Sequence, residues 1–144
     1  MVMFDPSIWG PHMWFFLHTS AMNYPKHPNA VTKKKFYDFF QNLHLFIPVE
    51  SMGSDFSKLL NEYPISPYLD NRESLVRWVW FIHNKINQKL EKSTITLNDF
   101  YVMYYDAYKP KNQKIREYYK IREKLVYFGF LFAMIATIYY LYSA

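Results

Sequence analysis

Residues 74–90 place the tightest limit on the fold, because their apolar side chains recur every three or four positions. That spacing predicts an amphipathic α-helix, and neither Gly nor Pro interrupts the run. Asp70, followed three residues later by Glu73, offers a capping-box-like start for this helix. The remaining chain also has helical spacing, with no alternating run bounded by hairpin turns. The sequence therefore predicts an all-α fold.

Three polar residues lie within this helix, beside its apolar stripe. His83 and Asn87 are four positions apart and share one side, with Asn84 one step round. Solvent-exposed side chains are the commoner case for such residues. If they are buried, each needs a partner, because an unpaired buried polar group costs roughly 1–3 kcal/mol. A planar ligand rich in hydrogen-bonding groups would satisfy all three, and both interpretations stay open on spacing alone.

The length and composition exclude several classes of protein. A chain of 144 residues suits one compact domain, and three glycines are too few for the usual phosphate-binding loops. The absence of cysteine excludes disulfides, thiolate chemistry and zinc–thiolate sites within this chain. The five histidines show no metal-ligand spacing, so no metal site is predicted.

The C-terminal segment is typical of a membrane anchor. Residues 125–142 carry no charge, and as a helix they would extend about 27 Å, close to the thickness of a bilayer's hydrocarbon core. Residues 109–124 hold seven basic and two acidic side chains, which accounts for the whole net charge of +5. Because this excess flanks the apolar segment, it favours a membrane surface over nucleic acid. We expect a domain at 1–108, a basic connector at 109–124 and a single-pass anchor at 125–142, with residues 1–124 in the cytosol.

Helices are also predicted in the N-terminal half. Asp5 and Pro6 open the first, on which Trp14 and His18 share a face, and Tyr24–Pro25 ends it. A second helix is expected from residue 29 or 32 to about residue 46. Pro48 then interrupts, and a third helix begins at about residue 49.

Taken in order, these features resemble the Erv/ALR family of FAD-dependent sulfhydryl oxidases. The matching residues are Trp9-Gly10-Pro11-x-x-Trp14-x-x-Leu17-His18-x-x-Ala21, Tyr24-Pro25, Pro48 before a short helix, Trp78, and His83-Asn84-x-x-Asn87. They cover roughly residues 7–92, and their joint order and spacing are specific. The apolar C-terminal segment lies outside the shared domain and looks more like the compact versions of large DNA viruses, which implies a host or virion membrane.

The resemblance implies a four-helix bundle with a short fifth helix that binds FAD, usually as a homodimer acting on protein thiols. The positions that it assigns to the cofactor are Gly10, Trp14, His18, Trp80, His83, Asn84, Ile86, Asn87, Leu90 and Lys92. A basic side chain at the end of this set suits a pyrophosphate.

The chain departs from the family at its reactive centre. The family has Cys-x-x-Cys just after the proline that matches Pro48, and here Val49 and Met52 occupy those two positions. Neither valine nor a thioether forms a disulfide, so we expect a chain that binds FAD but does not oxidise thiols. Both replacements are apolar, like a buried cysteine, and the fold should tolerate them. An engineered cysteine-free variant and a pseudoenzyme both fit this pattern, and the alternative function is a membrane-tethered helical interaction or assembly protein.

Overall fold

The computed structural model describes residues 4–143, which form helices joined by short loops. Residues 1–100 and 101–144 group into two compact units. The first contains α1 (Pro6–Met22), α2 (Ala30–Asn42), α3 (Glu50–Glu62) and α4 (Arg72–Lys89), with short 3₁₀ turns at Leu43–Phe46 and Ser66–Tyr68. The first four residues of α5 (Leu97–Tyr108) are the last residues of this unit, and the rest of α5 belongs to the second unit. The predicted all-α fold, four bundled helices with a short fifth, is confirmed.

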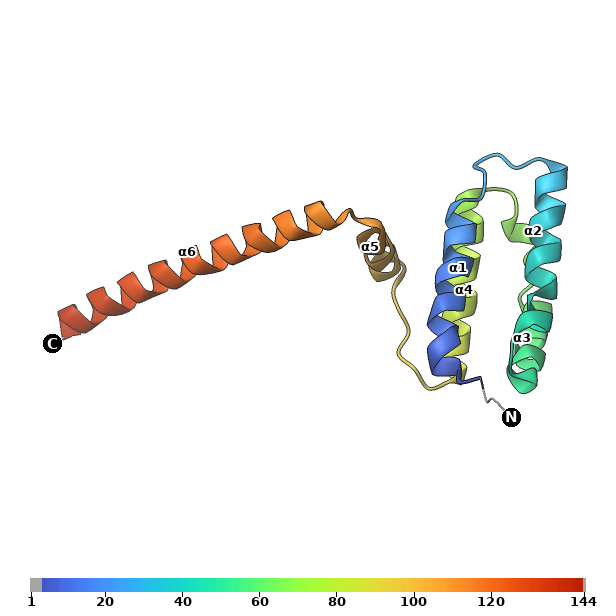
Figure 1. Cartoon of the computed structure of the whole chain (residues 1–144), viewed down its shortest axis with the longest axis horizontal. Helices are drawn as coiled ribbons and strands as arrows, with labels where there is room; N and C mark the ends of the chain where they lie inside the picture. Colours follow the sequence, from blue (N-terminus) through green and yellow to red (C-terminus); the bar gives the residue numbers. More distant parts are fainter. Residues whose placement is uncertain (1–3, 144) are drawn as a thin grey trace. The chain divides into compact units, whose positions relative to one another are not determined.

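The core of the first unit lies on α4, along which α1 packs (Figure 1). Leu75, Val79 and Ile82 are at most 1% exposed, as the periodicity predicted. Trp78 is also buried, and its Nε1 donates to the carbonyl of Tyr63 at 3.0 Å. Since the indole N–H of Trp78 has this partner, its burial carries little desolvation cost.

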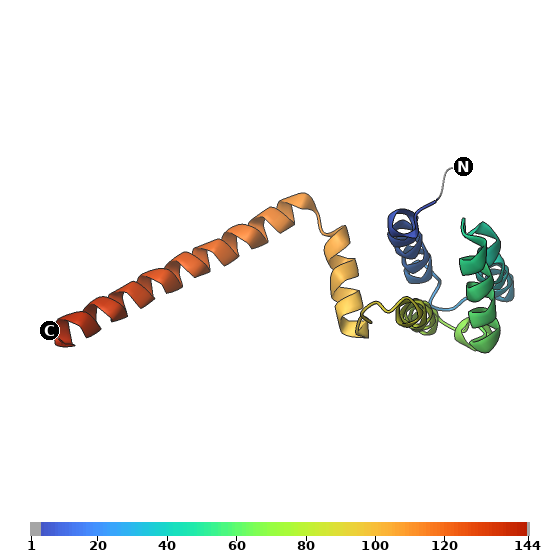
Figure 2. The ribbon, with the colours of Figure 1, turned by 90° about the horizontal axis from the view of Figure 1, so that it is seen from below.

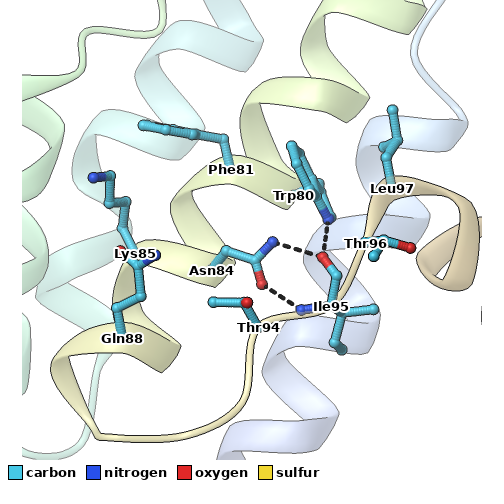
Figure 3. A pocket seen from close by; sticks show the side chains of 9 residues that line it. All are labelled: Trp80, Phe81, Asn84, Lys85, Gln88, Thr94, Ile95, Thr96 and Leu97. Carbon is cyan, nitrogen blue, oxygen red and sulfur yellow. Dashed lines mark hydrogen bonds between the residues drawn. The ribbon is translucent and has the colours of Figure 1, made fainter.

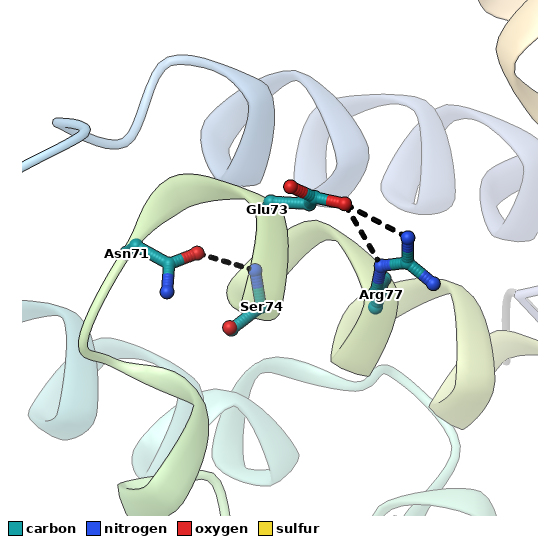
Figure 4. A network of polar contacts seen from close by, with 4 residues as sticks. All are labelled: Asn71, Glu73, Ser74 and Arg77. Atoms are coloured by element: carbon teal, nitrogen blue, oxygen red, sulfur yellow. Dashed lines mark hydrogen bonds and ion pairs between the residues drawn. The ribbon is translucent and has the colours of Figure 1, made fainter.

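The start of α4 differs from the prediction. Asn71 is the N-cap, and its Oδ1 accepts from the backbone N–H of Ser74 at 2.9 Å (Figure 4). Glu73 does not form the predicted capping box with Asp70; it forms an ion pair with Arg77, one turn later. Asp70 instead forms an ion pair with Lys33 at 2.6 Å. Both Asp and Asn are good caps, and the ion pair to α2 draws Asp70 away from the helix.

The second unit contains α6 (Lys111–Ser143), a single uninterrupted helix (Figure 2). Within residues 4–143 it is the one helix long and apolar enough to cross a membrane, and its apolar side chains are exposed. Lys109 precedes it and pairs with Asp106 at 2.7 Å and with Glu117 at 3.0 Å. These ion pairs join the end of α5 to the first turns of α6 through Lys109.

Candidate functional site

One face of α1 carries three of the predicted site residues. Gly10, Trp14 and His18 follow one another at steps of four, so they lie along a single stripe of the helix. Asp5 caps the helix by accepting from the N–H of Ser7 at 2.8 Å. The helix runs through Pro11 to Met22, and this continuity keeps the stripe in register along α4.

His18 and His83 form the centre of the site. The Nε2 atom of His18 lies 2.9 Å from the Nδ1 atom of His83, across the contact between α1 and α4. Trp14 stacks on His83 with the ring centroids 4.0 Å apart and the planes 8° apart. The buried ring of Phe100 lies against His18, with a centroid separation of 4.5 Å. The structure thus brings Trp14, His18 and His83 together.

Both imidazoles are neutral at pH 7. Burial is the main reason that the pKa of His18 falls to about 3, with a smaller contribution from His83. Burial also dominates in His83, whose pKa falls to about 4 with the help of the positive charge of Lys92. Neutral rings stack and hydrogen-bond without the cost of burying a charge.

The end of α4 brings Lys92 back towards His83. Glu91 has a φ of 55°, the left-handed conformation. The N–H of Glu91 donates to the carbonyl of Gln88 at 3.1 Å, and that of Lys92 to the carbonyl of Asn87 at 2.8 Å. These two bonds are the Schellman arrangement, which glycine usually closes. After this reversal Lys92 is close enough to His83 to lower the pKa of that imidazole.

The side chains of Asn84 and Trp80 point towards Ile95, in the loop after α4, and not towards the histidine pair. The side-chain amide of Asn84 donates to the carbonyl of Ile95 at 2.8 Å and accepts from the N–H of Ile95 at 3.0 Å. Trp80 Nε1 donates to the same carbonyl at 2.8 Å (Figure 3). The idea that one ligand satisfies His83, Asn84 and Asn87 together therefore does not describe Asn84, whose amide already has the backbone of Ile95 as its partner.

These residues also line an open pocket of about 470 Å³ between α4 and the loop that follows it. The lining residues are Trp80, Phe81, Asn84, Lys85, Gln88, Thr94, Ile95, Thr96 and Leu97 (Figure 3). The Nζ atom of Lys85 lies 5.3 Å from the ring centroids of both Tyr63 and Phe81, within the range of a cation–π contact.

The other predicted α4 positions follow His83 in the last turns of the helix. Ile86 and Asn87 are half-buried in the last turns of α4, and Leu90 is its exposed C-cap. The carbonyls of Ile86 and Asn87 accept from the N–H of Leu90. Gly10 lies at the start of the α1 stripe, and among residues 4–143 no atom outside its own stretch of helix lies within 4 Å of where a Cβ would be.

Val49 and Met52 mark the start of α3. Val49 is the N-cap, without a side-chain cap bond, and its carbonyl accepts from the N–H of Gly53 at 3.0 Å. Met52 is half-buried in the first turn. A Cβ on Gly53 would lie 2.7 Å from the carbonyl oxygen of His44, so α3 approaches the preceding 3₁₀ turn closely. The predicted helix start after Pro48 is confirmed to within one residue.

Sequence reasoning missed two residues of this region. Phe100 packs against His18, and Ile95 supplies the backbone partner of Trp80 and Asn84. A local signal existed for Phe100: the Thr96–Asp99 pair caps α5, with Asp99 N–H donating to Thr96 Oγ1 at 3.1 Å, and so starts the helix that carries Phe100. No local signal existed for Ile95.

Comparison with known proteins places the same region in a family. The model of the Erv1 / Alr family matches residues 11–106. A probable FAD-linked sulfhydryl oxidase of Acanthamoeba polyphaga mimivirus is 33% identical over 93 residues, covering 64% of this chain and 65% of the relative. The mitochondrial FAD-linked sulfhydryl oxidase of Schizosaccharomyces pombe is 36% identical over 83 residues, 58% of this chain and 46% of the relative. The crystal structure of the FAD-binding domain of Erv1 from Saccharomyces cerevisiae has a TM-score of 0.67 at 29% identity, covering 74% of this chain and 100% of that one.

Proposed function

Because the chain belongs to the Erv1 / Alr family, we propose that it is an FAD-binding helical domain that does not by itself oxidise thiols. The matched segment spans less than two thirds of the length of the two relatives described above, so the activity of those proteins is carried over only as a proposal. The grouping of Trp14, His18 and His83 supports the proposed FAD binding. The absence of cysteine from the 144 residues supports the proposed lack of thiol oxidation.

The residues of this group fit the chemistry of FAD. A flat aromatic stack and two neutral imidazoles suit the cofactor's ring systems, and Lys92 supplies a cation for its pyrophosphate. When bound, FAD supplies a two-electron acceptor that oxygen can reoxidise. Trp14, His18, His83 and Lys92 would hold and orient it, with Gly10, Ile86, Asn87 and Leu90 as further contacts from the same two helices.

Loss of the reactive pair explains why we propose no thiol oxidation. In the family a dithiol delivers electrons to the cofactor, and Val49 and Met52 occupy the corresponding positions at the start of α3. Valine has no redox chemistry, and a thioether neither forms a thiolate nor a disulfide. The chain therefore keeps binding and orientation and lacks the group that would accept a substrate's electrons.

The decisive experiment has a binding arm and an activity arm. The purified chain should be yellow, or become so on reconstitution with FAD, and it should not consume oxygen with a dithiol. The double variant Val49→Cys, Met52→Cys should gain thiol-dependent oxygen consumption, whereas Val49→Ser, Met52→Ser should not. A colourless chain that cannot be reconstituted would overturn the proposal, and it would favour the interaction-module alternative.

We also propose that a second copy of the chain covers the exposed aromatic surface of α1 and α2. Phe15, Phe16 and Phe39 are 44%, 57% and 36% exposed, and Phe16 contacts Phe39 edge-on at 6.1 Å. Exposed aromatic clusters of this kind are typical of interfaces. Sedimentation of Phe16→Glu against Lys34→Glu, a charge change on the same helix pair, tests this: only the first should give monomers.

For α6 we propose a single membrane crossing with residues 1–124 on the cytosolic side. Its length and composition support the crossing, and the basic residues on its N-terminal side support the orientation. Resistance to carbonate extraction, with the N-terminal region digested by protease added to the cytosolic side, is the expected result. Release into the soluble fraction would overturn it.

A further inference from the structure

The loop between α4 and α5, residues 91–96, is fastened at three points, and we call it the strap. At its start the N–H of Lys92 donates to the carbonyl of Asn87 at 2.8 Å. Near its end Ile95 is held by Trp80 and Asn84. At its last residue Thr96 caps α5. A loop fastened this often holds its backbone in one arrangement.

We propose that Trp80 and Asn84 are positioning residues: they clamp the strap at Ile95 and thereby hold Lys92 beside His83, and they do not touch the cofactor themselves. The inference rests on the proposed function, since the anionic group that Lys92 would meet is the pyrophosphate of FAD. Trp80 and Asn84 were expected to contact the cofactor, and the proposal gives them a positioning role instead.

The hydrogen bonds at Ile95 support this role. The carbonyl of Ile95 accepts two donors, Trp80 Nε1 and Asn84 Nδ2, both at 2.8 Å, which uses both of its lone pairs. Its N–H donates to Asn84 Oδ1 at 3.0 Å. The backbone of Ile95 is thus fully paired through two side chains of α4, and the amide of Asn84 is aimed at the strap on both of its polar atoms (Figure 3).

The position of Lys92 explains why this clamp matters. Lys92 lies between two anchored points, its own N–H on Asn87 and the clamp three residues later at Ile95. It is near enough to His83 to lower the pKa of that imidazole. A long, exposed lysine on a free loop would lose conformational freedom on meeting an anion, and a fastened backbone reduces that loss.

A double-mutant cycle on the full chain in detergent tests the proposal. We expect Asn84→Leu and Lys92→Met each to weaken FAD binding about tenfold, equivalent to about 1.4 kcal/mol. Combining them should add nothing to Lys92→Met alone, because Asn84 acts through Lys92. Additive losses, near a hundredfold, would mean that Asn84 contacts FAD directly, and an unchanged affinity in Asn84→Leu would mean that the clamp is irrelevant. Either result overturns the proposal.

Two control variants separate the clamp from general packing. Gln88→Leu makes the same amide-to-aliphatic change in a residue that lines the same pocket, and it should leave FAD affinity unchanged. An equal loss in Gln88→Leu would overturn the clamp. Trp80→Phe keeps the aromatic packing and removes the Nε1–H, so it should weaken FAD binding in the same direction as Asn84→Leu even if the latter folds poorly.

A readout without FAD keeps the test independent of the proposed function. In the chain free of cofactor, Asn84→Leu should remove the hydrogen-exchange protection of the Ile95 N–H and raise the pKa of His83 as far as Lys92→Met does, whereas Gln88→Leu should change neither. If no variant binds FAD, the proposed function fails, and these two measurements still decide whether Asn84 holds Lys92 in place. A His83 pKa that responds to Lys92→Met but not to Asn84→Leu would refute the positioning role.

Discussion

The Nε2 atom of His18 lies 2.9 Å from the Nδ1 atom of His83, so one ring nitrogen carries a proton and the other accepts it. A second proton on either ring would place a charge in a buried contact that already has Lys92 nearby. The pair is therefore built for the neutral state, and its energetics depend on pH.

We expect the stability of the chain to fall as the pH drops below about 6.5, the ordinary pKa of histidine. The folded-state pKa values are lowered to about 3 for His18 and about 4 for His83. Between these values and 6.5 the unfolded chain binds more protons than the folded one, so stability present above pH 6.5 is lost on acidification. Urea unfolding at pH 7 and pH 4.5 should differ by about 2 kcal/mol for each histidine, roughly 5 kcal/mol for the pair. His18→Gln should flatten the difference, and an equally steep dependence in that variant would contradict the assignment.

Glu91→Gly should stabilise the chain by about 0.5–1 kcal/mol, because Glu91 holds a left-handed φ of 55° that glycine adopts without strain. Ser93→Gly, two residues further along the strap, lacks this conformational reason and should be neutral or destabilising. Chemical denaturation measures both. Destabilisation by Glu91→Gly would show that the glutamate side chain itself contributes more than its backbone costs.

Gly53→Ala should destabilise the chain by about 1–3 kcal/mol, because the new Cβ would lie 2.7 Å from the carbonyl oxygen of His44. Gly10→Ala is the matched control: it also lies in a helix, but nothing lies within 4 Å of its Cβ position, so it should stabilise α1 by up to about 1 kcal/mol. Equal effects of the two substitutions on the melting temperature would contradict the close approach of α3.

Asn71→Ala should cost about 1 kcal/mol, since it removes the side chain that accepts from the N–H of Ser74 at the start of α4. Asp70→Ala removes only an exposed ion pair with Lys33 and should have a much smaller effect. The reverse order of these two losses in thermal melts would restore Asp70 as the cap.

The sequence predicted those parts of the molecule that depend on local spacing. Residues 74–90 were expected to be helical, and α4 spans Arg72–Lys89 with the expected apolar residues buried. The start of α3 after Pro48 followed from the restraint that proline places on its neighbours. The neighbourhood of Trp14, His18 and His83 followed from the resemblance, which supplied the pairing of helices that spacing alone does not give.

The remaining features depend on contacts between distant residues. The roles of Trp80 and Asn84 depend on Ile95, whose partner atoms belong to the backbone and so leave no mark in the sequence. Similarly, Asp70 and Asn71 are both suitable caps, and in the fold Asn71 caps α4 while Asp70 pairs with Lys33 of α2. Local signals predict helices well, whereas the choice among polar partners is made by the tertiary structure.

A Cβ on Gly53 would lie 2.7 Å from the carbonyl oxygen of His44, so steric fit restrains the backbone at the start of α3 independently of the side chains at Val49 and Met52. On the function proposed above, replacing those two side chains by cysteine should therefore create a redox pair without moving the helix. Catalytic competence would then be separable from architecture in this fold.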